Sequence, residues 1–283
     1  MSMAIDLATV KRINDFVYTK PRAVQEVAQL IKRNWRTAES YIQQISSQMG
    51  TIAVRTLREG TRGAVKIAYW NNTDAINATQ AQELLMKKLE VGKTKKDFSP
   101  FDIYQYVHKK KRTSFFEDQA EENINVKQDL VGSLRKAKRQ VLIFSGNLSW
   151  ANLIQGREKL IDVFAELADK GIHIKILTKV DITSIENVSK VLGINAHTGK
   201  DMIEVRHCEQ PLRAFSVDNK FVKLKEIKDP KDYGSCKRKK TYIFYEIRDE
   251  PWLEWLQKVF WRFFASSIPA KRRVEDLRTV KRL

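Results

Sequence analysis

The chain has 283 residues, with 52 lysines and arginines against 34 aspartates and glutamates, and a formal net charge of +18. Its hydrophobic content of 42% is enough for a folded core and excludes wholesale disorder. This length fits two domains, and this excess of positive charge favours a polyanionic partner, above all nucleic acid. Cys208 and Cys236 are too few for a disulfide framework and lack zinc spacing, so we expect no metal and no cofactor. Since no uninterrupted apolar run approaches the ~18 residues of a membrane span, we expect a cytoplasmic, chromosome-associated protein.

The N-terminal residues predict three helices. Apolar residues recur at helical spacing over residues 6–18, again over 22–33, and once more after Asn34. Pro21 is placed to break the first helix and to open the second, and Asn34 is a good N-cap for the third. The third helix is expected to bury one face, formed by Ala38, Tyr41, Ile42 and Ile45.

After Gly50 the apolar period changes from helical to two, which predicts two strands. The segments TIAVRTL and AVKIAYW flank a glycine-bearing loop, REGTRG. Three helices followed by a basic hairpin resemble the winged helix-turn-helix of bacterial and archaeal transcriptional regulators, over residues 5–70. The resemblance implies that residues 1–72 are a DNA-binding domain whose third helix enters the major groove.

The third predicted helix exposes polar side chains long enough to reach base edges, and it carries a single acid, Glu39. These predicted DNA-reading residues are Trp35, Arg36, Thr37, Ser40, Gln43 and Gln44. The wing cations expected to meet phosphates or the minor groove are Arg55, Arg58, Arg62 and Lys66. The alternative is a winged helix that serves only dimerisation or protein binding.

Residues 73–123 are expected to connect the DNA-binding domain to the rest of the chain. A helix containing Leu84, Leu85 and Leu89 is followed by basic runs mixed with aromatic residues and by a break at Ser99-Pro100. This connector is either a solvated linker or an arm whose lysines touch the DNA backbone.

Residues 124–268 predict an α/β domain, which makes the chain a multi-domain α/β protein. The apolar strand QVLIFSG, the helix GREKLIDVFAELADKG and the strand IHIKILTK form one βαβ unit with a parallel strand pair. Later come a strand at 202–208, a hairpin turning at Asp218-Asn219, a strand at 241–249 and an amphipathic helix over 252–268. Residues 269–283 are expected to form a basic tail.

The segment PLRAFSVD at 211–218, with the strands around it, resembles the phospholipase D-like superfamily. The signature of that family is His-x-Lys, four residues and Asp. Asp218 matches the aspartate, Arg213 stands at the lysine, and Pro211 replaces the histidine. Proline cannot attack phosphorus or relay a proton, so we expect no phosphodiesterase activity and no catalytic residue. His207 lies four residues too early to restore the motif.

A winged helix fused to a degenerate phospholipase D-like domain resembles the TrmB-type archaeal regulators. That resemblance implies a homodimer whose body binds an effector, a sugar or phosphorylated metabolite. Ligands of parallel sheets lie beyond the carboxyl ends of the strands. The predicted effector pocket therefore contains Asn147, Ser149, Trp150, Arg213 and Asp218. The alternative is that Arg213 and Asp218 form an ion pair and that Trp150 belongs to the core.

The sequence thus predicts a sequence-specific transcriptional regulator that binds double-stranded DNA, with the helix at 252–268 as one candidate dimer interface. One alternative is a divergent nuclease that uses His207 or another nucleophile. Another is a chromatin- or RNA-associated protein without sequence preference. The run at 237–240 and the tail from Lys271 are further candidates for contact with DNA phosphates.

Overall fold

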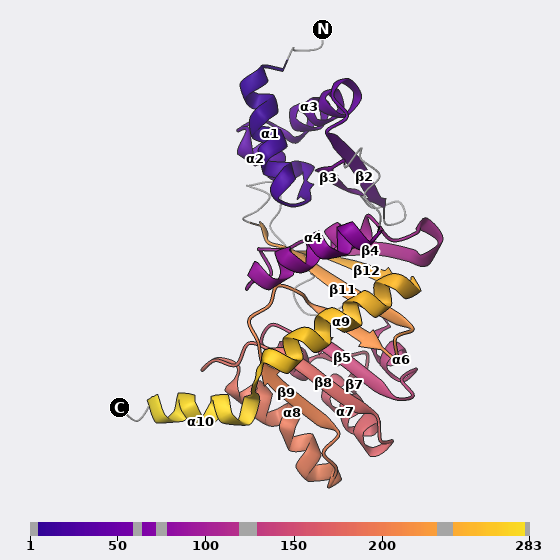
Figure 1. The fold of residues 1–283 in the computed structure, drawn as a ribbon, viewed down its shortest axis with the longest axis vertical. Coiled ribbons are helices and arrows are strands. Elements are labelled where there is room, and N and C mark those ends of the chain that lie inside the picture. The colour runs from indigo at the N-terminus through magenta and orange to yellow at the C-terminus, as the bar shows by residue number, and fades with distance from the viewer. Residues whose placement is uncertain (1–4, 59–63, 72–77, 119–128, 231–239, 281–283) are drawn as a thin grey trace.

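The computed structural model describes residues 5–58, 64–71, 78–118, 129–230 and 240–280. Residues 5–71, here called the head, lie at one end of the molecule, and residues 78–280, the body, contain the large sheet (Figure 1). The predicted α/β class is confirmed.

The head consists of three helices and a three-stranded antiparallel sheet. Its elements are α1 (Leu7–Thr19), β1 (Arg22–Ala23), α2 (Val24–Leu30), α3 (Trp35–Gln48), β2 (Ile52–Arg58) and β3 (Ala64–Trp70). The sheet order is β1-β3-β2. Asn34 caps α3 as predicted, since its side chain accepts a hydrogen bond of 2.9 Å from the backbone N–H of Thr37.

One prediction for the head is wrong, because residues 22 and 23 do not belong to the second helix. Arg22 and Ala23 form β1, which pairs with Ala68 and Ile67 of β3. The backbone groups of this dipeptide are satisfied by the sheet, so α2 begins only at Val24.

The body is built on an eight-stranded mixed sheet in the order β13-β9-β8-β5-β10-β11-β12-β4. Its strands are β4 (Arg112–Asp118), β5 (Gln140–Phe144), β8 (His173–Thr178), β9 (Ile203–His207), β10 (Ala214–Val217), β11 (Phe221–Lys228), β12 (Thr241–Ile247) and β13 (Ile268–Pro269). The predicted parallel pair is confirmed as β5 and β8, and β9 extends it. A small hairpin, β6 (Ile154–Gln155) and β7 (Glu158–Lys159), lies outside this sheet.

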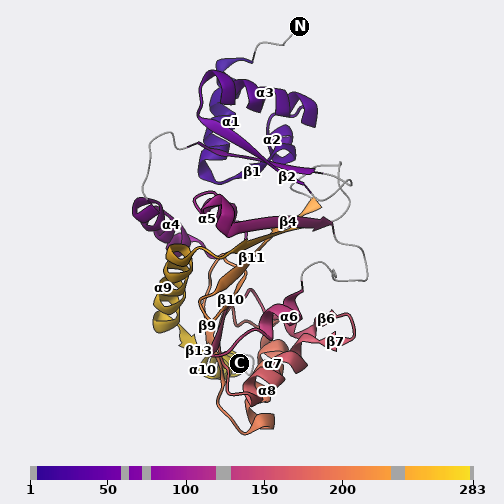
Figure 2. The same cartoon turned by 90° about the vertical axis from the view of Figure 1, so that its right-hand side faces the viewer.

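Helices cover both faces of the body sheet (Figure 2). The helical segments are α4 (Ala78–Val91), α5 (Phe101–Tyr104), η1 (Lys109–Lys111), α6 (Leu130–Leu134), η2 (Ser149–Asn152), α7 (Leu160–Asp169), α8 (Ile185–Thr198), α9 (Glu250–Ser266) and α10 (Ala270–Val280). Along β5, Leu142 and Phe144 join the cluster with α4, α5 and α9, whereas Val141 and Ile143 join the cluster with α6, α7 and α8. This alternation is the period of two expected of a strand buried on both faces.

The predicted connector is an integral part of the body. β4 pairs with β12 as the edge strand of the large sheet. Leu85 and Leu89 of α4 share one buried cluster with Leu57 and Val65 of the head hairpin. The apolar residues of α4 therefore pack between the head hairpin and the body. The described part of residues 73–123 is not a solvated linker.

A buried ion-pair network also joins head and body. Lys228 of β11 lies 2.8 Å from the carboxylate of Glu26 of α2 and 3.3 Å from that of Glu226. Ser99 and Tyr245 donate hydrogen bonds to Glu226, of 3.0 and 2.9 Å. Burial alone would raise the pKa of Glu26, but Lys228 lowers it below its usual value.

The C-terminal region corrects one further prediction and adds structure to another. The apolar face of α9, including Trp252 and Phe260, is buried in the core of its own chain, so this face is not available as a dimer interface. Most of the predicted basic tail is α10, whose Ala270 and Val274 are buried against the body. Of the run at 237–240, residues 237–239 lie outside the described residues, and Lys240 is exposed.

Candidate nucleic-acid interface

Helix α3 lies at the outer end of the head (Figure 1), and its polar side is at the surface. Its apolar stripe is buried as predicted: Ala38, Tyr41, Ile42 and Ile45. On the other face, Trp35 is 46% exposed, Arg36, Ser40 and Gln43 are exposed, and Thr37 and Gln44 are half-buried. The structure therefore keeps all six predicted side chains together on one helix face, which we call the α3 face.

The single acid of α3 is neutralised from the hairpin. Glu39 forms an ion pair with Lys66 of β3, and its carboxylate also accepts a 3.4 Å hydrogen bond from the Gln43 side chain. Lys66 therefore offsets a carboxylate instead of presenting a free charge to phosphate. This pair was not predicted, although a lone acid on a helix that precedes a lysine-bearing hairpin was a usable signal.

The other predicted DNA-binding cations of the β2–β3 hairpin lie in different environments. Arg58 is exposed at the end of β2. Arg55 faces the body, where its guanidinium lies 5.0 Å from the ring centroid of Tyr104, and Arg112 lies 4.7 Å from the same ring. Arg55 is therefore part of the contact between head and body, which corrects its assignment to the DNA surface. Arg62 lies outside the described residues.

Arg213 and Asp218 lie at opposite ends of β10. Ala214 pairs with Phe144 and Val217 pairs with Val141, because β10 runs antiparallel to β5. Arg213 is therefore near the carboxyl end of β5, and Asp218 is near its amino end. The two residues form neither the predicted common pocket nor the alternative ion pair.

Asp218 has a structural role at the turn between β10 and β11. Its carboxylate accepts hydrogen bonds from the backbone N–H groups of Lys138, Arg139 and Gln140, at 2.6, 2.9 and 2.9 Å. Burial alone would raise the pKa of Asp218, but these backbone donors lower it. Asp218 thereby holds the hairpin turn against the start of β5.

Arg213 is held against the loop that follows β5. Its guanidinium donates hydrogen bonds to the carbonyl oxygens of Leu212 (2.6 Å) and Gln210 (3.3 Å). It also lies over Gly146, where a Cβ atom would approach Arg213 to 2.6 Å. No acidic side chain of the described residues forms an ion pair with it, and burial lowers the pKa of Arg213 to about 10.

The loop after β5 keeps two of its predicted ligand residues at the surface. Asn147 and Ser149 are exposed. The ring of Trp150 packs at 4.6 Å from Phe164 and 6.0 Å from Phe215, between centroids. Trp150 is therefore partly buried against the core, which favours the alternative interpretation over a ring that stands free to stack on a sugar.

His207 and Pro211 are also fixed by packing. The Nδ1 atom of His207 accepts a 2.9 Å hydrogen bond from the backbone N–H of Val180, and burial lowers the pKa of His207. Pro211 is buried beside Gly92.

In the part of the chain that the structure describes, no group of three or more His, Cys, Asp or Glu residues could hold a metal ion. The described helices include none long and apolar enough to cross a membrane.

Comparison with known proteins gives only distant structural likeness. No family model matches the chain, and no curated protein matches it. Nuc from Salmonella typhimurium, a phospholipase D family member, has 11% identity over 56% of this chain and 97% of its own, with a TM-score of 0.39. TrmBL2, an archaeal chromatin protein with a novel mode of DNA binding, has 13% identity over 93% of both chains, with a TM-score of 0.40. NucT from Helicobacter pylori has 12% identity over 56% of this chain and 99% of its own, with a TM-score of 0.39. Identities and scores this low carry no argument about function.

Proposed function

We propose that the chain is a transcriptional regulator that binds double-stranded DNA through a winged helix-turn-helix head. The observation that carries the proposal is the α3 face, where hydrogen-bonding side chains are exposed and Lys66 neutralises the one acid, Glu39. The order α1-β1-α2-α3-β2-β3, with β1 added to the β2–β3 hairpin, supports a winged helix. An α-helix with such a face fits the width of the major groove.

The body, in this proposal, is a phospholipase D-like domain without catalytic activity. The residue at the position of the family's nucleophile is Pro211, and the carboxylate of Asp218 is engaged by three backbone donors. The body anchors the head and pairs two copies of the chain, so that two α3 helices meet two half-sites. The hydrogen bonds of Arg213 to backbone carbonyls use its Nη1 atom, so the other N–H groups of its guanidinium, beside the exposed Asn147 and Ser149, are where an anionic effector would bind.

The test of DNA binding is the variant Arg36→Glu, compared with Lys11→Glu on α1 as a control of equal charge change. Both side chains are exposed, so neither change affects the core. We expect Arg36→Glu to weaken duplex binding on the order of a hundredfold, since it places a carboxylate against the groove, whereas Lys11→Glu changes affinity only slightly. Equal affinities for the two variants across a salt titration would contradict the proposal.

Two further assays separate this proposal from its alternatives. Competition with random duplex of equal length distinguishes a specific regulator, which retains its selected site, from a chromatin protein that exchanges freely. Incubation of the pure protein with plasmid in EDTA tests the body, because the phospholipase D-like nucleases cut without metal. Strand cleavage in that assay, if lost in His207→Ala, would identify a nuclease instead.

A further inference from the structure

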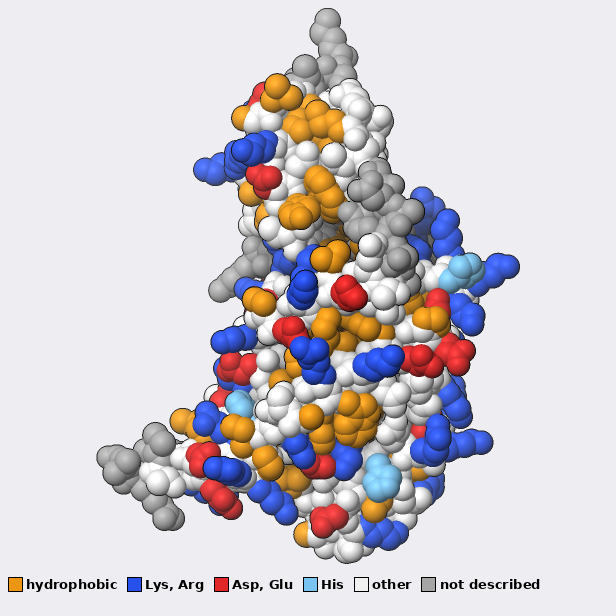
Figure 3. Space-filling view, viewed as in Figure 1, with side chains coloured by type: hydrophobic (Ala, Val, Ile, Leu, Met, Phe, Trp, Pro, Cys, Tyr) orange, Lys and Arg blue, Asp and Glu red, His pale blue; other side chains and the backbone are white. Residues whose placement is uncertain are grey.

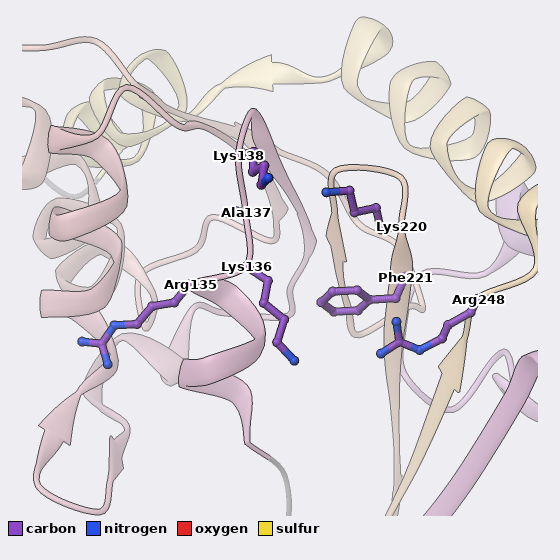
Figure 4. Close-up of a pocket in the computed structure, with 7 residues that line it drawn as sticks. All are labelled: Arg135, Lys136, Ala137, Lys138, Lys220, Phe221 and Arg248. Atoms are coloured by element: carbon purple, nitrogen blue, oxygen red, sulfur yellow. The ribbon is translucent and has the colours of Figure 1, made fainter.

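A strongly basic pocket lies on the body between the loop after α6 and the β10–β11 hairpin. Its volume is about 550 Å³. Figure 4 shows the residues that line it. Ala137, Phe221 and five cations line the pocket, with no acid among them; the cations are Arg135, Lys136, Lys138, Lys220 and Arg248. The pocket is at the amino end of β5, opposite the carboxyl end where Arg213 lies.

The fold itself gathers these cations. The three backbone hydrogen bonds to Asp218 hold the segment 138–140 against the hairpin turn. Lys138 and Lys220 therefore stand beside each other, although they are far apart in sequence (Figure 4). The ring of Phe221 lies 5.2 Å from the guanidinium of Arg248 and holds that side chain at the pocket.

The positive charge of the pocket is only partly neutralised. Arg135 turns away to Glu158 and Glu166, and Arg248 pairs with Glu246 at 2.6 Å. Lys220 lies 4.0 Å from Asp218, whose carboxylate already accepts three backbone donors. For Lys136 and Lys138, no acidic partner is present among the described residues. Burial lowers the pKa of nearby Lys223; the carboxylates of Glu246 and Asp129 oppose this effect, and the charges of Lys136 and Arg248 add to it.

The pocket continues into a basic strip along the edge of the body. The backbone N–H of Arg248 donates a 2.8 Å hydrogen bond to the carbonyl of Lys111, the last residue of η1. All three lysines of η1, 109–111, are exposed. Figure 3 shows lysine and arginine side chains recurring along the right-hand edge of the body, with a group of acidic side chains between them.

The chemistry of the pocket fits phosphate, and its form fits an extended polyanion. The lysines that line it are exposed, and they continue a surface strip, whereas sites for small molecules enclose most of their ligand. We propose that this pocket binds a backbone phosphate of duplex DNA, so that the body makes a second, sequence-independent contact beyond the head. This inference rests on the proposed function.

The test compares two triple variants with the same loss of charge. One is Lys136→Gln/Lys138→Gln/Lys220→Gln, and the control is Lys159→Gln/Lys190→Gln/Lys200→Gln, whose lysines are exposed around α7 and α8. Duplex affinity is measured against salt concentration, with thermal unfolding to verify that both variants fold. Each lost phosphate contact reduces the slope of log K against log salt by about one. The slope of the pocket variant should therefore fall by about two to three, and that of the control by less than about one. Preference for the selected site over random duplex should remain unchanged.

Each failure has a distinct signature. If the unaltered protein does not bind duplex at all, the proposed function fails. If it binds, and the pocket variant has the same salt slope as the control, the inference is overturned while the function of the head stands. A calorimetric titration with ATP is the second arm. Binding of ATP that the pocket variant loses, together with an unchanged duplex slope, would overturn the DNA contact in favour of a free phosphorylated ligand.

Discussion

The α3 face and the segment 211–218 were both predicted as binding sites, but their polar side chains have opposite surroundings in the fold. On α3, one stripe enters the core and the other face stays at the surface with its polar side chains. In 211–218, Ala214 faces one core cluster and Phe215 and Val217 face the other. The polar residues at its two ends, Arg213 and Asp218, bond to backbone groups.

The difference shows where a polar side chain remains available for a partner. A surface helix buries about one face in two, so most of its outward side chains are not needed for core packing. A strand inside an eight-stranded sheet has both faces covered, so polar groups at its ends must satisfy the backbone of neighbouring loops. The predictions below test this contrast, ordered by the expected change in the free energy of unfolding.

The largest effect is expected for Lys228→Met. The substitution leaves the carboxylates of Glu26 and Glu226 buried without their cation, and breaking such a network costs about 3–5 kcal/mol. Denaturant unfolding should show head and body losing stability in one common transition. Lys95→Met, which removes the more exposed pair with Asp229, is the control and should cost less than about 1 kcal/mol. An early, separate transition of the head would show that the two regions do not fold as one unit.

Asp218→Ala tests whether the aspartate serves the fold or a ligand. The loss of an acceptor for three backbone N–H groups should cost about 2–4 kcal/mol by thermal unfolding. Because the folded state lowers the pKa of Asp218, its contribution is present at neutral pH and is lost as the pH falls below the usual carboxyl range. Ser149→Ala at the exposed loop is the control, with a change within about 0.5 kcal/mol. If Asp218→Ala left the unfolding temperature unchanged, Asp218 would again be a candidate ligand-binding residue.

Asp102→Asn should stabilise the protein at neutral pH. Burial raises the pKa of Asp102 to about 6, so the folded state favours the protonated carboxyl. The contribution of Asp102 to stability is therefore fully present below the unfolded-state pKa of about 4, and it is lost as the pH rises through the folded-state pKa of about 6. The variant should gain about 1–3 kcal/mol over the natural chain at pH 7 and almost nothing at pH 4. Asp15→Asn, at an exposed position, is the control. If Asp102→Asn gained equal stability at both pH values, the raised pKa of Asp102 would not be the cause.

Gln43→Ala should have the smallest effect on stability. Its side chain is exposed on the α3 face, so the free energy of unfolding should change by less than about 0.5 kcal/mol. Duplex affinity should nevertheless fall by about 1–3 kcal/mol, because the proposed contact of Gln43 with a base would be lost. A change in stability without a change in affinity would mean that the α3 face serves the fold.

Local signals were sufficient for much of the fold. The helical period and the Asn34 cap predicted α3, and the apolar runs predicted the parallel pair of β5 and β8. The hairpin turn at Asp218-Asn219 was also predicted, and both residues have positive φ, of 49° and 56°. The two residues of β1 were missed because so short a strand has no period of its own and depends on β3 for its hydrogen bonds.

The candidate site was predictable only where one element forms it. The α3 face follows from the helical period alone. The role of Arg55 depends on which side of β2 meets the body, and no pattern within the hairpin reveals this. The basic pocket combines residues 135–138, 220–221 and 248, which only the tertiary structure brings together.

The shared core of hairpin and body has a practical consequence for dissecting the protein. In a fragment truncated after residue 71, the side chains of Leu57, Val65 and Ile67, which are buried in the full chain, would form an exposed apolar patch. The truncation would also leave the carboxylate of Glu26 without Lys228. Such a fragment is expected to self-associate, so deletion mapping would report aggregation where full-length point variants report recognition.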